Sequence, residues 1–324
     1  MKRAENCVDC KIDHIWVEND SVVFQFAKSK GMQDGEDHVG PWHVYANPCN
    51  PNVCPVLALG KYLFTYPELL SSNASLFPGN SQYERFNDEF TELVKEYSEE
   101  LKIFGVEPGD LGTHSTRKGV GTAICAGCTM SPPIVSVCVR CGWVMGGVKD
   151  KYLKYEAAGD QFVGRCATLL DLLSKAFAIS PPYFDFSVSK DRVIHTPEEA
   201  LALEDKLILF LKERIPNYDC VRPATIALSR MMLASVCFHY KYLKTTLAAT
   251  SAFRASPIFR NIPDDLLTHC RISYPWDKTS YTPTFTGLPP HVLLFAENEE
   301  IKTEIRKIRD LIPQVRETKP TKEY

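Results

Sequence analysis

The sequence lacks an excess of basic residues. Its 324 residues include 37 lysines and arginines against 40 aspartates and glutamates, so the formal charge is −3 and the isoelectric point is about 6.3. This balance excludes a chain that binds nucleic acid through a uniformly basic surface. It does not exclude a DNA groove, which needs only a local positive lining.

Long hydrophobic runs are missing too. Runs such as Ile208-Leu-Phe-Leu211 are far too short to cross a bilayer. The N-terminal residues MKRAENCVDCK do not contain the apolar segment of a signal peptide. We therefore expect an intracellular protein with no membrane partner.

The sequence shows no internal repeat and no low-complexity tract, and 44% of its residues are hydrophobic. This content is enough to build hydrophobic cores, so a disordered chain is excluded. The length suits about two domains of roughly 100–200 residues each. Pro181-Pro182 marks a boundary, which predicts one domain over residues 1–180 and a mostly helical domain over 190–324.

The first domain is predicted to be mainly α-helical with a small antiparallel sheet. Residues 14–26 alternate apolar and polar side chains around a Glu-Asn-Asp turn, which indicates two short strands, and Trp42-His-Val-Tyr45 supplies a third. Together they predict a three-stranded antiparallel meander. Helices are expected near residues 56–64, 82–104, 113–127, 133–141 and 147–156.

The second domain begins with a strong helix start at Thr196-Pro-Glu-Glu199, which combines an N-cap, a proline at the first position and acidic residues. A long helix is predicted over 226–247. In a last helix, apolar residues recur at heptad-like spacing, which predicts either packing onto its own domain, the reading we prefer, or a short coiled coil. Those residues are Leu294, Ile301, Ile305, Ile308 and Ile312.

Twelve cysteines are a high count for an intracellular chain, in which thiols are mostly reduced. Three pairs have the C-x-x-C spacing of zinc ligands. Against a zinc site, one pair would lie on a single helix, with Pro132-Pro133 before the next pair. We expect buried thiols and no metal or other cofactor, and a zinc-dependent interaction protein is a third functional reading. The pairs are Cys7/Cys10, Cys125/Cys128 and Cys138/Cys141.

One set of residues has side chains that suit catalysis at a phosphate. His114 and Arg117 lie one helical turn apart, and Trp143 and then Tyr152 follow along the chain. An arginine fork binds two phosphate oxygens at once, an indole N–H can donate to a third, and a tyrosine hydroxyl can attack phosphorus. Tyr155, one turn after Tyr152, is the alternative nucleophile.

This order resembles the catalytic box of the tyrosine recombinase/integrase family, and more narrowly that of the Crypton and DIRS-like recombinases of eukaryotic mobile elements. The family pattern is Arg, Lys in a β-hairpin, His-x-x-Arg, His or Trp, then Tyr. The resemblance makes His114 and Arg117 phosphate-site residues, puts Trp143 in the place usually held by histidine, and makes Tyr152 the nucleophile. It covers about residues 3–160.

The same resemblance assigns Arg3 to the first arginine position, although Glu5 falls one residue early for the usual lead-in. The hairpin lysine, which acts as general acid, is Lys28 or Lys30 in Ala27-Lys-Ser-Lys30-Gly, and we favour Lys30 beside the glycine. The helical clamp domain that normally precedes the first arginine is missing from this sequence, and residues 196–324 are not part of the family pattern.

The resemblance implies DNA strand cleavage and rejoining through a 3′-phosphotyrosine, as in recombination and integration of a mobile element. Double-stranded DNA is then the partner, within a homo-tetramer, in the nucleus if the source is a eukaryote, with no small-molecule substrate. The alternative is a recombinase-derived DNA-binding protein whose catalysis is decayed or truncated, which the missing clamp and the acidic isoelectric point favour.

Overall fold

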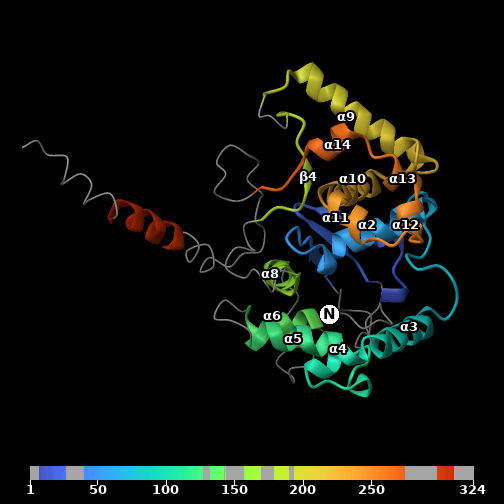
Figure 1. The fold of residues 1–324 in the computed structure, drawn as a ribbon, viewed down its shortest axis with the longest axis vertical. Coiled ribbons are helices and arrows are strands. Elements are labelled where there is room, and N and C mark those ends of the chain that lie inside the picture. The colour runs from blue at the N-terminus through green and yellow to red at the C-terminus, as the bar shows by residue number, and fades with distance from the viewer. Residues whose placement is uncertain are drawn as a thin grey trace, which may run out of the picture.

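A computed structural model gives a mainly helical protein with a small three-stranded sheet (Figure 1), as the sequence predicts at this coarse level. It describes residues 7–26, 40–126, 132–141, 143, 157–168, 179–189, 193–273 and 298–309. No helix in these ranges is both long and apolar enough to span a membrane.

The first group of helices lies before residue 169: α2 (Pro55–Thr65), α3 (Gln82–Glu96), α4 (Ser98–Ile103), α5 (Ser115–Ala126), α6 (Ile134–Cys141) and α8 (Ala157–Thr168). The later helices are α9 (Pro197–Lys212), α10 (Pro223–Phe238), α11 (Tyr240–Thr246), α12 (Ala252–Ala255), α13 (Pro257–Arg260) and α14 (Asp264–Thr268). Short 3₁₀ helices lie at Ile12–His14, Pro51–Val53, Pro67–Ser71, Pro108–Asp110 and Tyr218–Cys220.

The sheet is the predicted antiparallel meander of β1 (Ile15–Glu18), β2 (Ser21–Phe24) and β3 (Trp42–Tyr45), in the order β1-β2-β3. Asn19 makes the tight turn between the first two strands at a φ of 53°, a left-handed conformation that asparagine tolerates better than most residues. A second, two-stranded sheet pairs β4 (Tyr183–Phe184) with β5 (Cys270–Arg271).

One face of the three-stranded sheet packs against α2 and α10, and α10 comes from the second half of the chain. The two helices approach closely at Gly60, where an added Cβ would lie 3.2 Å from the Cβ of Met232. Their shared core also includes Val22 of β2 and Leu207 of α9. One hydrophobic core thus contains side chains from both predicted domains, and the boundary at 181–189 stays a prediction.

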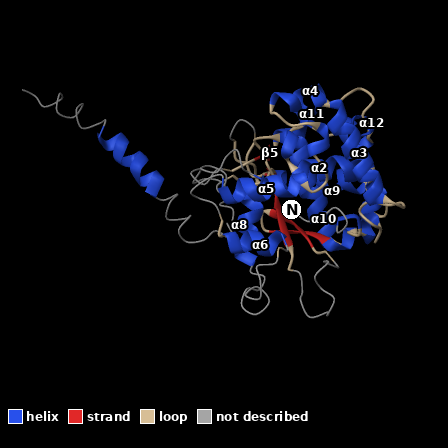
Figure 2. Ribbon diagram, turned by 90° about the horizontal axis from the view of Figure 1, so that it is seen from below, coloured by secondary structure: helices blue, strands red, loops and turns tan. Residues whose placement is uncertain are grey.

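The opposite face of the sheet packs against α8, which is joined by α5 and α6 (Figure 2). Strand residues alternate between faces, so His43 and Tyr45 of β3 point toward α8 while Trp42 joins the α2–α10 core. The sheet therefore lies between two helical layers. Residues 147–156, predicted to be helical, lie outside the described residues, and α8 was not predicted.

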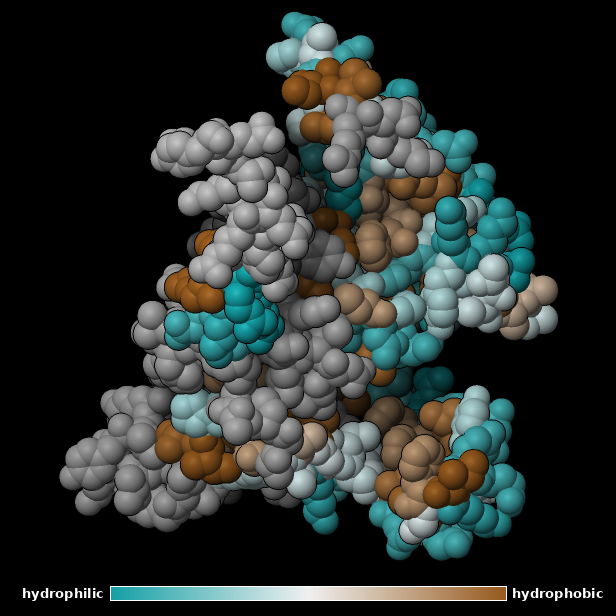
Figure 3. All heavy atoms as spheres, turned by 60° about the vertical axis from the view of Figure 1, so that its left-hand side comes forward, coloured by the Kyte–Doolittle hydropathy of each residue, from teal (hydrophilic) through white to brown (hydrophobic). Residues whose placement is uncertain are grey.

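The prediction of one helix over 82–104 is wrong. The helix is interrupted at Tyr97, which separates α3 from α4. These helices bury little: Val94 is the one buried side chain of α3. Phe86 and Leu93 of α3 and Phe104, directly after α4, are consequently exposed. Figure 3 shows apolar side chains at the surface among polar ones.

The predicted start of α9 is confirmed. The Thr196 hydroxyl accepts the Glu199 N–H at 3.2 Å, and the Glu199 carboxylate accepts the Thr196 N–H at 2.8 Å. The prediction of a single helix over 226–247 is wrong. This segment forms two helices, α10 and α11, which are separated at His239.

The expectation that the last helix packs onto its own domain is also wrong for its described part. Residues 298–309 are helical, every one of them is exposed, and they form the red helix that stands apart from the body in Figure 1.

The buried imidazole of His239, between α10 and α11, should make the stability of the folded protein depend on pH. Burial lowers the pKa of this imidazole from 6.5 to about 4, so the folded protein holds it neutral while the unfolded chain protonates it below about pH 6.5. The free energy of unfolding should therefore fall between pH 6.5 and pH 4, with up to about 3 kcal/mol due to His239.

In urea denaturation over that pH range, His239→Gln should show a shallower loss of stability than the wild type. The two proteins are compared first at pH 7.5, where the imidazole is neutral in both states. Parallel pH profiles would contradict this origin of the effect.

Candidate phosphate-binding site

Half of the residues predicted to form the site can be placed. His114, Arg117 and Trp143 belong to the described residues. The other half lie outside them: Arg3, Lys30 with its alternative Lys28, and Tyr152 with its alternative Tyr155.

His114 lies immediately before α5, and its side chain is exposed. The chain enters this helix through a tight turn in which the Ser115 N–H donates to the Gly112 carbonyl at 2.8 Å. The Ser115 hydroxyl in return accepts the Gly112 N–H at 3.0 Å. This turn sets His114 at the beginning of the helix, one turn before Arg117.

Arg117 is held in place from the far end of α6. Its Nη2 donates to the Cys141 carbonyl, and Cys141 is the last residue of that helix. The guanidinium carbon lies 5.8 Å from the centre of the Trp143 indole, within the range of a cation–π contact. The structure thus brings together two of the predicted site residues that lie far apart in the sequence.

Trp143 is positioned by both helices. Its backbone N–H donates to the Cys138 carbonyl at 2.9 Å, which continues the end of α6. Its ring lies over Gly121, one turn after Arg117 on α5, where an added Cβ would come within 2.8 Å of a ring carbon. The absence of a side chain at Gly121 is therefore what allows the indole to lie beside Arg117.

A small hydrophobic core supports this arrangement from below. It joins Ile124 of α5, Val137 and Cys141 of α6, and Phe162 of α8, and Trp143 packs against it. Burial raises the pKa of the Cys141 thiol, an effect that the Arg117 guanidinium partly offsets. The thiol beside the site therefore stays protonated at neutral pH and is a poor nucleophile.

A buried ion pair fixes α6 to α8 and to the sheet. Arg140 Nη1 lies 2.5 Å from Asp160 Oδ1, and both side chains are more than nine-tenths buried. Arg140 Nη2 also donates to the His43 carbonyl of β3 at 2.7 Å. The second Asp160 oxygen accepts the His43 backbone N–H at 2.9 Å and lies 3.0 Å from Nδ1 of its ring.

The pKa of Asp160 reflects this balance. Burial alone would raise it, but the Arg140 charge and the hydrogen bonds from His43 outweigh burial and hold it below its usual range. A lowered carboxyl pKa means that the stabilisation is present above about pH 4 and is lost as the pH falls through the lowered value.

A second buried pair lies beside the first. Arg165 of α8 donates to Asp20 at 2.6 Å, and its guanidinium carbon lies 4.1 Å from the centre of the Tyr45 ring. Gly164, the neighbouring residue, lets α8 approach β3 so closely that a Cβ there would lie 2.4 Å from the His43 carbonyl oxygen.

Arg140 and Asp160 were not predicted from the sequence as residues that position the site. A signal was present, because Arg140 is the single charged residue in the helix sequence IVSVCVRC. A lone charge on an otherwise apolar helix indicates a buried partner, but the sequence does not say which of 40 acidic residues it is.

The cysteine pairs do not assemble into a metal site among the described residues, in which no group of three or more potential ligands occurs. Cys125 is exposed while Cys138 and Cys141 are buried. Burial, together with nearby Cys7, raises the pKa of Cys10 to about 12. Cys128 lies outside the described residues.

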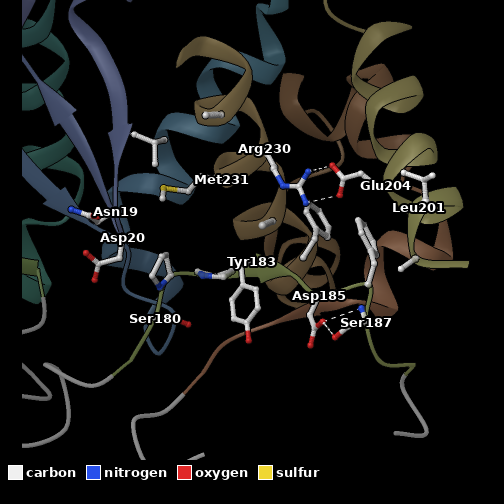
Figure 4. Close-up of a pocket in the computed structure, with 18 of the residues that line it drawn as sticks. Asn19, Asp20, Ser180, Tyr183, Asp185, Ser187, Leu201, Glu204, Arg230 and Met231 are labelled. Atoms are coloured by element: carbon white, nitrogen blue, oxygen red, sulfur yellow. Dashed lines mark hydrogen bonds and ion pairs between the residues drawn. The ribbon is translucent and has the colours of Figure 1, made fainter. Parts of the chain in front are cut away.

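A cavity of about 860 Å³ lies elsewhere, between the β1–β2 turn, the segment around β4, α9 and α10 (Figure 4). Arg230 and Glu204 form a two-pronged ion pair on its wall, and Asp185 holds the Ser187 hydroxyl at 2.5 Å. Its volume is in the range of small-molecule pockets. None of the residues predicted from the sequence to form the phosphate site lines it.

No family model matches the sequence, and comparison with curated proteins and with solved structures gives no significant match either.

The buried ion pair can be tested with a double-mutant cycle. Arg140→Met and Asp160→Asn should each lower the free energy of unfolding by about 3–5 kcal/mol, because each leaves a buried charge without its partner. The double variant should lose about 1–3 kcal/mol less than the sum of the two. Urea denaturation at neutral pH measures all three.

The matched control is Lys206→Met. Lys206 pairs with Asp265 at 2.8 Å, but both side chains are about half exposed, so its loss should cost about 1 kcal/mol or less. Strict additivity of the Arg140 and Asp160 changes would rule out the direct coupling described here.

Proposed function

We propose that this protein cleaves and rejoins DNA strands through a 3′-phosphotyrosine, in the manner of a tyrosine recombinase. The Tyr152 hydroxyl loses its proton as its oxygen attacks a phosphodiester, the bond from phosphorus to the 5′ oxygen breaks, and the leaving 5′ oxygen takes a proton. Rejoining is the reverse, in which a 5′ hydroxyl attacks the phosphotyrosine. The energy of the broken bond is retained in the phosphotyrosine, so no nucleotide and no metal are needed.

The observation that carries the proposal is the contact between Arg117 and Trp143. The family pattern places both side chains on one phosphate, and they do lie together, with the guanidinium fixed by the Cys141 carbonyl. A preset guanidinium suits a reaction that gathers negative charge on the non-bridging oxygens, because no reorganisation is needed when the charge develops.

The remaining roles follow the sequence pattern. Arg117 binds the phosphate through two oxygens, with Arg3 as the second arginine. Trp143 donates its indole N–H to an oxygen and shields the site from water. Lys30 protonates the leaving oxygen, and His114, which is exposed at the start of α5, is assigned to the same phosphate.

The partner under this proposal is duplex DNA, bound by a homo-tetramer of the chain, in the nucleus if the source is a eukaryote. A net charge of −3 for the whole chain means that DNA must be attracted locally, so binding should depend strongly on Arg117 and weaken with added salt.

The covalent step can be tested directly. Purified protein is incubated with nicked duplexes from the ends of its own element, in which the cleaved fragment diffuses away and traps the intermediate, and a denaturing gel detects the adduct. Tyr152→Phe should abolish the adduct, whereas Tyr155→Phe should retain it. Loss with Tyr155→Phe alone would move the nucleophile one turn along.

Absence of any adduct, together with DNA binding that Arg117→Ala weakens at least about tenfold, would favour the alternative of a DNA-binding protein without catalysis.

The contact between the indole and Arg117 can be perturbed without touching either residue. Gly121→Ala places a methyl group 2.8 Å from the Trp143 ring and should displace the indole, which slows adduct formation about 10- to 100-fold. Gly119→Ala is the matched control, because it lies on the same helix and an added Cβ there meets nothing within 4 Å. Equal single-turnover rates for the two variants would show that the indole is not part of the site.

A further inference from the structure

The helix at residues 298–309 presents an apolar stripe that nothing in the described chain covers. Ile301, Ile305 and Ile308 are 55%, 58% and 58% exposed. They recur at intervals of four and three residues, so they lie on one side of the helix. Isoleucines exposed in line on a free helix are typical of a surface that binds a partner.

The spacing fits the seam of a coiled coil. With Ile305 at position a of a heptad, Ile301 and Ile308 fall at position d, and Asn298 falls at the preceding a. A single asparagine at an a position fixes the register of the helices at some cost in stability. In the sequence the same repeat continues to Leu294 and Ile312.

The charged residues that flank the seam indicate which partner the helix binds. Position g is Glu304, and the e positions are Lys302 and Arg309. In a parallel pair of helices, a g residue faces the e residue of the next heptad on the other helix, which brings Glu304 opposite Arg309 of the second copy. Glu297 and Lys302 repeat this relation one heptad earlier in the sequence.

The antiparallel arrangement of two copies is disfavoured by the same residues. It pairs g with g and e with e, which opposes glutamate to glutamate and lysine to arginine across the seam. The helix is thus complementary to a parallel copy of itself.

We propose that the helix at 298–309 binds a second copy of this chain as a parallel coiled coil. The exposed pairs Lys302–Glu299 at 2.7 Å and Lys307–Glu304 at 2.6 Å lie within one helix, and Lys302 and Glu304 exchange these weak contacts for contacts across the seam. The proposal is independent of the DNA chemistry, since it uses no residue of the phosphate site.

The first experiment is sedimentation velocity of the full-length protein without DNA, over a concentration series. The wild type should shift from monomer to a larger species as its concentration rises. Replacement of all three isoleucines by glutamine should weaken association at least about tenfold, while Thr303→Gln on the outer side of the helix should leave it unchanged. These residues are exposed, so the fold of the body is not affected.

The second experiment tests the parallel pairing. Glu304→Arg alone and Arg309→Glu alone each set like charges across the seam and should self-associate weakly. An equal mixture of the two variants, and the double variant Glu304→Arg/Arg309→Glu, should both associate as the wild type does.

Three results would overturn the proposal: a monomer at every concentration, association that survives the isoleucine replacements, or a double variant that stays as weak as the single ones. A partner of another kind on this stripe would leave the purified wild type monomeric.

Discussion

The ion pair between Arg140 and Asp160 is the interaction on which the arrangement of the candidate site depends. It links α6 to α8, and through His43 it links both helices to β3. At the end of α6, the Cys141 carbonyl accepts a hydrogen bond from Arg117, and the Cys138 carbonyl accepts one from the Trp143 N–H. The position of the Arg117 and Trp143 side chains therefore depends on a pair of charges that contacts neither of them.

A buried ion pair of this kind contributes geometry more than net stability. The cost of removing two charges from water is close to what their attraction returns, whereas leaving one of them alone is expensive. Apolar contacts tolerate small shifts, but a guanidinium that must reach both a carboxylate and the His43 carbonyl accepts few positions. The second core beneath the site is small, and the polar contacts supply the directional restraint that it lacks.

Much of the fold could be predicted because the signals are local. Alternation in residues 15–24 specified the hairpin, and Thr196 with Glu199 specified the start of α9. The breaks at Tyr97 and His239 escaped prediction, because neither residue is a strong helix breaker and tertiary packing decides where such helices end.

The candidate site, too, could be predicted only in part from the sequence. The spacing of His114 and Arg117 on α5 followed from the sequence, whereas the pairing of Arg140 with Asp160 needed three dimensions. The isoleucine stripe at 298–309 was visible as a period, but a period alone does not distinguish an intramolecular core from an intermolecular seam.

Synthesis from the N-terminus also sets the order in which the two layers around the sheet can form. The helices α5, α6 and α8 all end by Thr168, so this layer can close as soon as Thr168 has left the ribosome. The other face of the sheet waits for α10, which ends at Phe238. Until then α2 covers only part of it, and Val17 and Val22 remain open to water on a nascent chain. If synthesis stalls between these two points, one face of the sheet stays partly uncovered, and exposed apolar surface of this kind is prone to aggregation.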